Sequence, residues 1–578
     1  MTWDVCIRDN ETGVAGRNRS ARHWPAEPAA RSRSEIPVTF ARHSAAPASV
    51  ARRGDERASV HQICRGRHAH SSLGHDRSRT PEVRAAGATM STAMARVPDS
   101  LRGQIVTPGD RRYAQLRSTY TRSASPAAVL LPKTTAQVVD ALRYAREQRL
   151  PIAVRSGGHG LSGASSNNGG VVIDLSMLNR VQVIDERAGL VRVEAGARWA
   201  NVAKALAPYG LVISSGDYGG VGVGGLATGG GVGWLVRAHG LTIDRVRAVE
   251  VVLADGTLVR ADADHEPELF WLVRGAGAGA GIVVAFEIEA AEQRNVGVVQ
   301  LVVEAHPDGR TVREWTSCLS QAPRELSAAA VVFAEGRSVL MSITAVVAAE
   351  SLRRTRPAVE PLLAIGKVLE HRTDLLPYPT LVPTAHLNPN VGQQRGTTTN
   401  GLFTALDEAG ARAVTRAVTG PGRATIQLRS LGGAVNDVAS DATAYPHRHQ
   451  DTLIVASVFA PQADAALNAA WRAAGARADG AYVNFESRPD PAAFARIYPG
   501  ETGARVRRLW KRYDPDGVFR SALLTGQPDR AAQPNRAAQP SRAGQVDRAA
   551  QPSRAAQPSR SAQPSGSGQP HRRRRRPR

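Results

Sequence analysis

The chain has 578 residues, of which 42% are hydrophobic, with 54 glycines, 35 prolines and three cysteines. This composition is sufficient for several domains with buried cores, and it excludes a disulfide scaffold and a collagen-like protein. The net charge of +23 is concentrated at the ends, because residues 1–90 hold 15 Arg against 9 acidic residues and residues 527–578 hold 12 Arg against 2 Asp. No apolar run is long enough for a membrane span or a secretory signal, so we expect a cytoplasmic protein without membrane contact.

The two ends, residues 1–95 and 524–578, show no sustained helical or strand periodicity and are predicted to be disordered extensions. The second repeats Arg every six residues among prolines, which favours an extended tail. Such a tail either contacts a polyanion non-specifically or is only a solvated extension. The first extension contains a group with zinc-compatible spacing: His61, Cys64, His68, His70 and His75. Because no fold surrounds this group, we predict no metal site.

Helical and strand patterns alternate between the extensions. Thr134 is a good N-cap, and it precedes a segment that places Val138, Leu142 and Ala145 on one face of a helix. The patterns predict, in chain order, a helix over 134–149, strands over 150–156, 169–175 and 189–196, a helix over 197–210, a hairpin turn at Asp255-Gly256 and a helix over 503–517. Residues 297–475 have longer amphipathic stretches and fewer glycines, which indicates a second domain or a large insertion.

Two stretches match the pattern G-x-G-x-x-G, beginning at Gly158 and at Gly220. Neither has the context of a Rossmann site, because a loop and a strand follow the first and the run Gly229–Gly231 makes a poor helix start after the second. Dense glycine nevertheless lets backbone N–H groups approach an anion closely. Two such turns suit a long diphosphate ligand with a flat ring against the same glycines; the alternative is that they are only tight turns.

Four segments in this order resemble one family: RSGGHGLSG, a glycine-rich stretch that includes VGVGGLATGGGVG, ELFWLVRGAGAGAGIV, and AYVNFESRPDP followed by KRYDPDGVFR. They are similar to the berberine bridge enzyme-like flavin oxidoreductases of the vanillyl-alcohol oxidase and p-cresol methylhydroxylase superfamily. The resemblance implies an α+β fold with a two-part FAD-binding domain of the p-cresol methylhydroxylase type and a substrate domain with an antiparallel sheet. The implied boundaries are 97–296 and 478–523 for the FAD-binding domain and 297–477 for the substrate domain.

The resemblance also implies that His159 bonds to the 8α-methyl group of FAD, since a neutral imidazole nitrogen is a nucleophile near pH 7. Some members add a second bond from a Cys, but that position here is Tyr218, so we expect a single covalent link. Val221 matches a position that controls oxygen access, and its small side chain favours an oxidase over a dehydrogenase. The other cofactor-binding residues implied are Arg155, Ser156, Gly157, Gly158, Gly160, Ser162, Asp217, Gly222, Gly224, Gly225, Gly229, Gly230, Ile282 and Asn484. Gly279 and Ala280 stand where the family pattern has Asn and Phe.

Tyr482 is the candidate catalytic base, because the flavin takes a hydride while a base takes the proton of the neighbouring O–H or N–H. Its pKa, ordinarily near 10, would have to fall by roughly 2–3 units for this role near pH 7. Asn484, on the same face if this segment is a strand, would bond the flavin or orient Tyr482. Tyr445 and His447 are weaker candidates for substrate binding.

The predicted function is that of an oxidase that transfers a hydride from a small alcohol, sugar or secondary-metabolite substrate to covalently bound FAD and reduces O2 to H2O2. Two alternatives stay open. One is a dehydrogenase that uses another electron acceptor. The other is a catalytically impaired flavin- or polyanion-binding protein that uses its arginine-rich tails.

Overall fold

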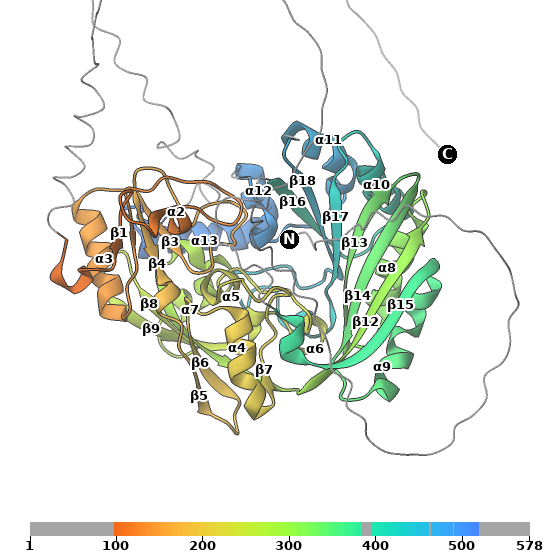
Figure 1. Cartoon of the computed structure of the whole chain (residues 1–578), viewed down its shortest axis with the longest axis horizontal. Helices are drawn as coiled ribbons and strands as arrows, with labels where there is room; N and C mark the ends of the chain where they lie inside the picture. The colour runs from red at the N-terminus through yellow and green to blue at the C-terminus, as the bar shows by residue number, and fades with distance from the viewer. Residues whose placement is uncertain (1–96, 384–395, 462–463, 489, 520–578) are drawn as a thin grey trace, which may run out of the picture. The chain divides into compact units, whose positions relative to one another are not determined.

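The computed structural model describes residues 97–383, 396–461, 464–488 and 490–519 (Figure 1). The predicted extensions, the arginine repeat and the His/Cys group of the first extension lie outside these residues. The described part mixes helices with four sheets, so the predicted α+β fold class is confirmed. Within the same ranges, no helix has both the length and the apolar character that a membrane crossing requires.

The first sheet has the strand order β1-β2-β4-β3, and the three adjacent strands β2, β4 and β3 are parallel. Its strands are β1 (Ile105–Val106), β2 (Ala128–Leu130), β3 (Ile152–Arg155) and β4 (Val171–Asp174). Helix α3 (Thr135–Glu147) links β2 to β3, and the Thr134 hydroxyl caps it by accepting from the N–H of Gln137. Val138, Leu142 and Ala145 are fully buried, as the sequence pattern predicts. Strand β3 therefore delivers the chain directly into the turn that contains His159.

The second sheet is antiparallel, with the order β5-β6-β10-β8-β9. Its strands are β5 (Val181–Asp185), β6 (Leu190–Glu194), β8 (Val246–Val252), β9 (Leu258–Asp262) and β10 (Ile282–Glu289). The predicted hairpin at Asp255-Gly256 joins β8 to β9, with Gly256 at a φ of +92°. Helix α4 (Trp199–Leu206) follows β6, and a short 3-10 turn leads to the left-handed Gly210, which ends the predicted helix. Short helices α5 (Val223–Ala227) and α6 (Val236–His239) and helix α7 (Pro267–Ala276) complete this region.

A seven-stranded antiparallel sheet follows, in the order β15-β12-β14-β13-β17-β18-β16. Its strands are β12 (Asn295–Ala305), β13 (Leu326–Glu335), β14 (Ser338–Val347), β15 (Lys367–Pro377), β16 (Gly396–Phe403), β17 (Thr425–Ser430) and β18 (Thr452–Phe459). Helices α8 (Arg310–Gln321), α9 (Leu352–Val359), α10 (Glu408–Thr419) and α11 (Asp464–Gly475) cover one face with an apolar core (Figure 1). The other face packs against residues from outside this sheet that include Val232, Val236 and Tyr482.

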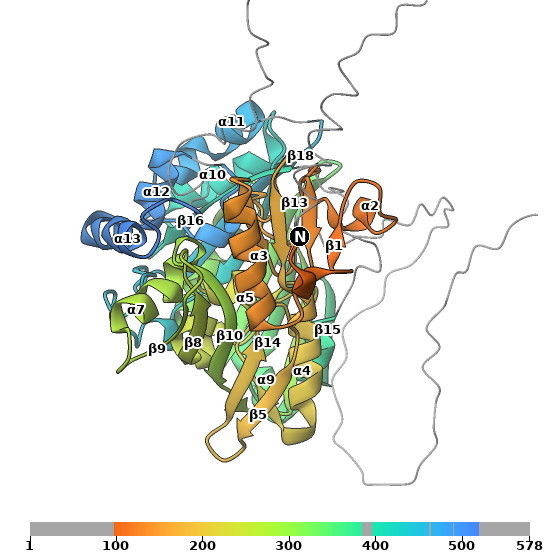
Figure 2. The same ribbon diagram turned by 90° about the vertical axis from the view of Figure 1, so that its left-hand side faces the viewer.

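The end of the described chain returns to the first two sheets through α12 (Pro491–Ile497) and α13 (Gly500–Tyr513), which lie near α7 in Figure 2. The predicted helix over 503–517 corresponds to α13, and it buries Val506, Leu509 and Trp510. The indole N–H of Trp510 donates to the carbonyl of Ala276 at 3.0 Å. This helix therefore completes the layer built by α7 and β10.

Candidate active site

The two glycine-rich segments meet. A Cβ added to Gly157 would lie 2.2 Å from the backbone N of Gly222, and one added to Gly222 would lie 2.1 Å from the Ser156 hydroxyl oxygen. The Ser156 hydroxyl donates to the carbonyl of Ala195 at 2.6 Å. Gly158 has a φ of +69°, a conformation that favours glycine. Glycine is therefore required here for backbone contact, and the prediction that the two turns serve one site has a structural basis.

Residues 195–200 support the second turn through backbone hydrogen bonds. The N–H groups of Val223 and Gly224 donate to the carbonyls of Ala197 and Ala195, each at 2.9 Å. The N–H of Trp199 donates to the carbonyl of Val221 at 3.1 Å. Helix α5 begins at Val223, inside the motif, and no helix starts at Gly229–Gly231, as the sequence predicts. The helix has only five residues, since the glycines that follow end it.

The His159 imidazole lies between two tyrosine rings. It stacks on Tyr120 with ring centroids 4.9 Å apart and an interplanar angle of 28°, and it lies 5.3 Å from the tilted ring of Tyr218. Tyr120 was not predicted, because a single tyrosine in a polar loop carries no sequence signal. A Cβ added to Gly160 or Gly225 would meet no atom within 4 Å, so the surface next to both turns is open.

Tyr482 and Asn484 reach the second glycine segment from the far end of the chain. The Tyr482 hydroxyl accepts hydrogen bonds from the N–H of Gly231 at 2.8 Å and from the Asn484 side-chain amide at 2.7 Å. A Cβ on Gly230 would lie 2.8 Å from the Tyr482 ring, so this close approach also depends on glycine. The expectation that both residues share a strand face is wrong, because residues Val483–Phe485 form a 3-10 turn. The turn nevertheless brings the two side chains into contact.

Burial raises the pKa of Tyr482 to about 12, although its hydrogen bonds from Gly231 and Asn484 and the charge of Arg429 act in the opposite direction. The expected lowering of this pKa is therefore not a property of the folded chain.

Arg429 pairs with Asp217 at 2.5 Å, and both side chains are buried. The carboxylate of Asp217, predicted to line the cofactor, is thus held by a buried guanidinium that sequence analysis did not single out.

Tyr445 and His447 belong to the same group of side chains. The Tyr445 ring lies 6.0 Å from the Tyr482 ring in an edge-on arrangement and 5.6 Å from the His447 ring. Burial raises the pKa of Tyr445 far above its usual value and lowers the pKa of His447 to about 4. One ring nitrogen of His447, Nε2, lies 3.0 Å from the carbonyl oxygen of Ile497. His447 is therefore neutral at pH 7, with Nε2–H as the donor.

The buried neutral His447 predicts acid lability. Its folded pKa of about 4 is below the unfolded value of 6.5, so the unfolded chain binds more protons and stability falls as pH drops from 6.5 towards 4. The shift corresponds to roughly 3 kcal/mol at the acid end. Urea unfolding at several pH values should show a shallower acid loss for His447→Gln than for the parent chain. The exposed His265 is the control: its glutamine variant should keep the parent slope, and an unchanged slope for His447→Gln would contradict the assignment.

Three other predicted residues lie beside the turns rather than in their open face. The guanidinium of Arg155 is buried in an ion pair with Asp174 at 2.7 Å and donates to the carbonyls of Ser118 and Leu116. The side chain therefore holds the turn from behind, and the role of Arg155 as a cofactor ligand stays a prediction. Ser162 accepts from the N–H of Ala164 in a local turn, and Ile282 is buried at the start of β10.

The position of Trp510 explains why residue 279 is Gly in this chain, where the family pattern has Asn. A Cβ added to Gly279 would lie 2.6 Å from the indole nitrogen of Trp510, so a larger side chain has no space there. Ala280 is fully buried against the same core. An aromatic side chain thus fills this region from α13 instead of from the glycine segment itself.

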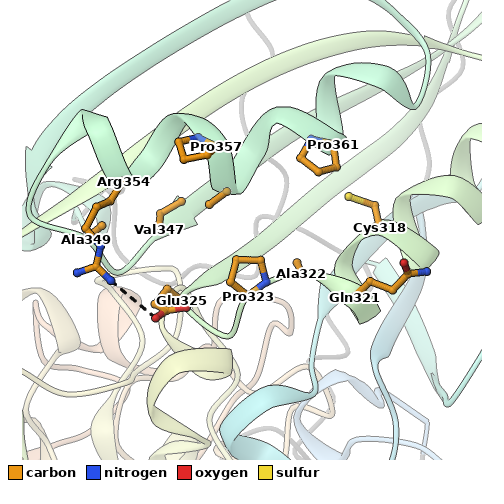
Figure 3. Close-up of a pocket in the computed structure, with 11 residues that line it drawn as sticks. Cys318, Gln321, Ala322, Pro323, Glu325, Val347, Ala349, Arg354, Pro357 and Pro361 are labelled. Atoms are coloured by element: carbon orange, nitrogen blue, oxygen red, sulfur yellow. Dashed lines mark ion pairs between the residues drawn. The ribbon is translucent and has the colours of Figure 1, made fainter.

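A separate cavity of about 580 Å³ opens between α8 and α9 on the seven-stranded sheet (Figure 3). Cys318 lines it, and burial raises the pKa of this thiol. Two of the residues that line the cavity, Arg354 and Glu325, form an ion pair with 4.0 Å between Nη2 and Oε1, and both side chains are partly exposed. None of its lining residues belongs to the glycine turns or to the group around Tyr482, so Cys318 is not a second attachment residue of that site.

The comparisons with known proteins agree with this arrangement. The model of the family described as "FAD binding domain" matches residues 126–262. The uncharacterized FAD-linked oxidoreductase YgaK of Bacillus subtilis (strain 168) is 28% identical over 443 residues, which cover 73% of this chain and 96% of that protein. The solved BBE-like 1 of Physcomitrella patens aligns with a TM-score of 0.65 at 24% identity, over 73% of this chain and 97% of its own. Glucooligosaccharide oxidase of Acremonium strictum, an enzyme with a 6-S-cysteinyl, 8α-N1-histidyl FAD, aligns with a TM-score of 0.64 at 20% identity, over 74% of this chain and 98% of its own.

The matched domain, the full-length relative and the fold together define this protein as an FAD-linked oxidoreductase. Its architecture is that of the p-cresol methylhydroxylase type. The resemblance to the berberine bridge enzyme-like oxidases that the sequence motifs indicate is confirmed.

Proposed function

We propose that the protein is an oxidase that attaches FAD to His159, oxidises a small alcohol, sugar or secondary-metabolite substrate, and passes the electrons to O2 to form H2O2. The observation that carries this proposal is the contact of Tyr482 with the second glycine segment through Gly231, at 2.8 Å. It joins a candidate base to the same pair of turns that holds the His159 imidazole. The solved glucooligosaccharide oxidase, which carries a histidyl FAD on this fold, supports both the attachment and an oligosaccharide as one substrate class.

The residues of the chain fit the cofactor. The meeting of Gly157 with Gly222 and the open space beside Gly160 and Gly225 provide a cradle for a long flat ligand. His159 would hold the flavin covalently, and Ser156, Gly158 and Gly229 would line it. When bound, FAD supplies the hydride acceptor of the reaction.

Tyr482 would take the proton of the substrate hydroxyl. Two N–H donors, from Gly231 and Asn484, already point at its oxygen, and both stabilise a phenolate more than a phenol. The cation of Arg429 acts in the same direction. Asn484 keeps the phenol oriented, while Tyr445 and His447 would border the substrate.

The proposal predicts peroxide release. The yellow holoenzyme, supplied with a panel of oligosaccharides, monosaccharides, primary and secondary alcohols and hydroxylated heterocycles under air, should form one H2O2 per substrate oxidised. A peroxidase-coupled dye assay measures the peroxide, and anaerobic bleaching of the flavin absorbance measures reduction. Bleaching by a substrate without peroxide under air would replace the oxidase with a dehydrogenase that uses another acceptor.

A further inference from the structure

Arg198, the residue just before α4, sits where the two glycine-rich turns meet. Its Nη1 atom donates to the carbonyl of Gly157 in the first turn and to the carbonyl of Gly220 in the second, both at 2.6 Å. A single guanidinium nitrogen therefore joins two segments that are separated in the sequence by strands β4, β5 and β6. The backbone of Arg198 also forms an antiparallel bridge with Gly222, which fixes the base from which the side chain extends.

Among the described residues no carboxylate forms an ion pair with this guanidinium, although the charge of Asp174 acts on it from beyond that distance. Among the described residues, we find no Asp or Glu oxygen within 4 Å of Arg198, whereas Arg155 and Arg429 each have a buried acidic partner. Burial lowers the pKa of Arg198, and the charge of Asp174 acts in the opposite direction. Within the described ranges, its hydrogen bonds use Nη1 alone and leave the Nε and Nη2 donors for a further acceptor.

The bond to Gly157 also sets the direction of the next amide. Across a trans peptide the C=O and N–H groups point in opposite directions. Because the Gly157 carbonyl points at Arg198, the N–H of Gly158 points away from it, towards the other side of the turn. Gly158 has the left-handed φ that such a turn needs, and its own carbonyl is held by the N–H of Tyr120 at 2.9 Å.

We propose that Arg198 is the positioning residue of the FAD cradle and its selectivity element for the diphosphate: it orients the Gly158 amide and supplies the positive charge that favours an anionic ligand. Desolvated cations and aligned backbone N–H groups both stabilise bound phosphate. This inference rests on the assignment of FAD to the two glycine turns.

The test separates the diphosphate from the flavin ring. Full-length chain carrying His159→Ala, freed of flavin, is titrated with FAD and with riboflavin, which has the same ring but no phosphate, and fluorescence quenching gives the two dissociation constants. Adding Arg198→Met should raise the constant for FAD by about tenfold, because both the charge and the fixed direction of the Gly158 N–H are lost, and change that for riboflavin by less than about twofold. An equal rise in both constants, or an unchanged constant for FAD, would overturn the proposal.

Arg237 provides the matched control. It is a buried arginine in α6 that also donates to two carbonyls, those of Leu431 and Ala322, without a carboxylate within 4 Å among the described residues. Arg237→Met should lower the unfolding temperature but leave the ratio of the two constants unchanged; a changed ratio would overturn the proposal by showing that loss of any buried arginine is sufficient. If Arg198→Met does not fold, Arg198→Lys gives the result. Lysine keeps the charge but not the planar fork, so it must weaken FAD more than riboflavin, by less than tenfold.

The His159→Ala chain without a change at Arg198 distinguishes failure of the flavin-site assignment from failure of the role of Arg198. If it binds neither FAD nor riboflavin, the assignment of the flavin site to these turns fails. If it binds FAD and the Arg198 variants bind it equally well, only the role of Arg198 fails.

Discussion

Replacing His159 by alanine is expected to abolish the covalent attachment of FAD. The imidazole is the one nucleophile of the described glycine turns held between two rings, at 4.9 Å from Tyr120 and 5.3 Å from Tyr218. The denatured gel band of the parent chain should fluoresce under ultraviolet light after acid treatment, and the band of the variant should be dark. The native variant should still bind FAD reversibly, because the glycine turns remain.

The exposed His265 serves as the control for this experiment. His265→Ala should keep the fluorescent band, since this side chain only contacts Asp262 at the surface. A fluorescent band in His159→Ala would move the attachment to another residue. A dark band in the parent chain would show that its flavin is not covalently bound.

Replacing Tyr482 by phenylalanine is expected to reduce kcat by about 10²–10⁴-fold, the usual contribution of a general base. The change removes the oxygen to which Gly231 and Asn484 donate but keeps the aromatic ring and its packing. Since burial raises the pKa of this phenol and the base acts when deprotonated, kcat of the parent enzyme should rise with pH across the neutral range. The variant should lose that rise, while its flavin content stays the same.

A tyrosine elsewhere in the core tests whether the effect is specific. Tyr144 is buried in α3, away from the group around Tyr482, and Tyr144→Phe should leave both kcat and its pH dependence unchanged. Retention of turnover and of the pH-dependent rise in Tyr482→Phe would remove this residue from the mechanism. Loss of flavin from that variant would assign Tyr482 a role in cofactor binding instead.

Sequence patterns predicted the elements whose signals are local. The Thr134 cap with its apolar stripe, the glycine that ends the helix at Gly210 and the hairpin at Asp255-Gly256 each depend on neighbouring residues. The two glycine runs indicated turns that suit one ligand, but they gave no sign that Gly157 and Gly222 are in contact. The sequence did not show that residues 195–200 support the second turn, because hydrogen bonds to that loop have no compositional signature.

The side chains that organise the site through long-range contacts could not be predicted from the sequence. Tyr120 and Arg198 are ordinary residues in their own segments, and only the fold places them against His159 and the glycine carbonyls. Arg155 shows a further case, because a motif can single out a residue without showing that its charge is paired with Asp174. For Tyr482 and Asn484, a spacing of two residues fits a strand face and a 3-10 turn equally well, so the pattern could not distinguish them.

The return of the chain from the seven-stranded sheet sets the order in which the site is assembled during synthesis. Tyr482 meets Gly231 across 251 residues of chain, and Trp510 meets Ala276 across 234. When the first two sheets leave the ribosome, the residues that complete them have not been translated. The contacts of Tyr482 and Trp510 with the first two sheets therefore form only after the intervening sheet has been translated. Nascent chains arrested before α12 should accordingly emerge without tightly held flavin.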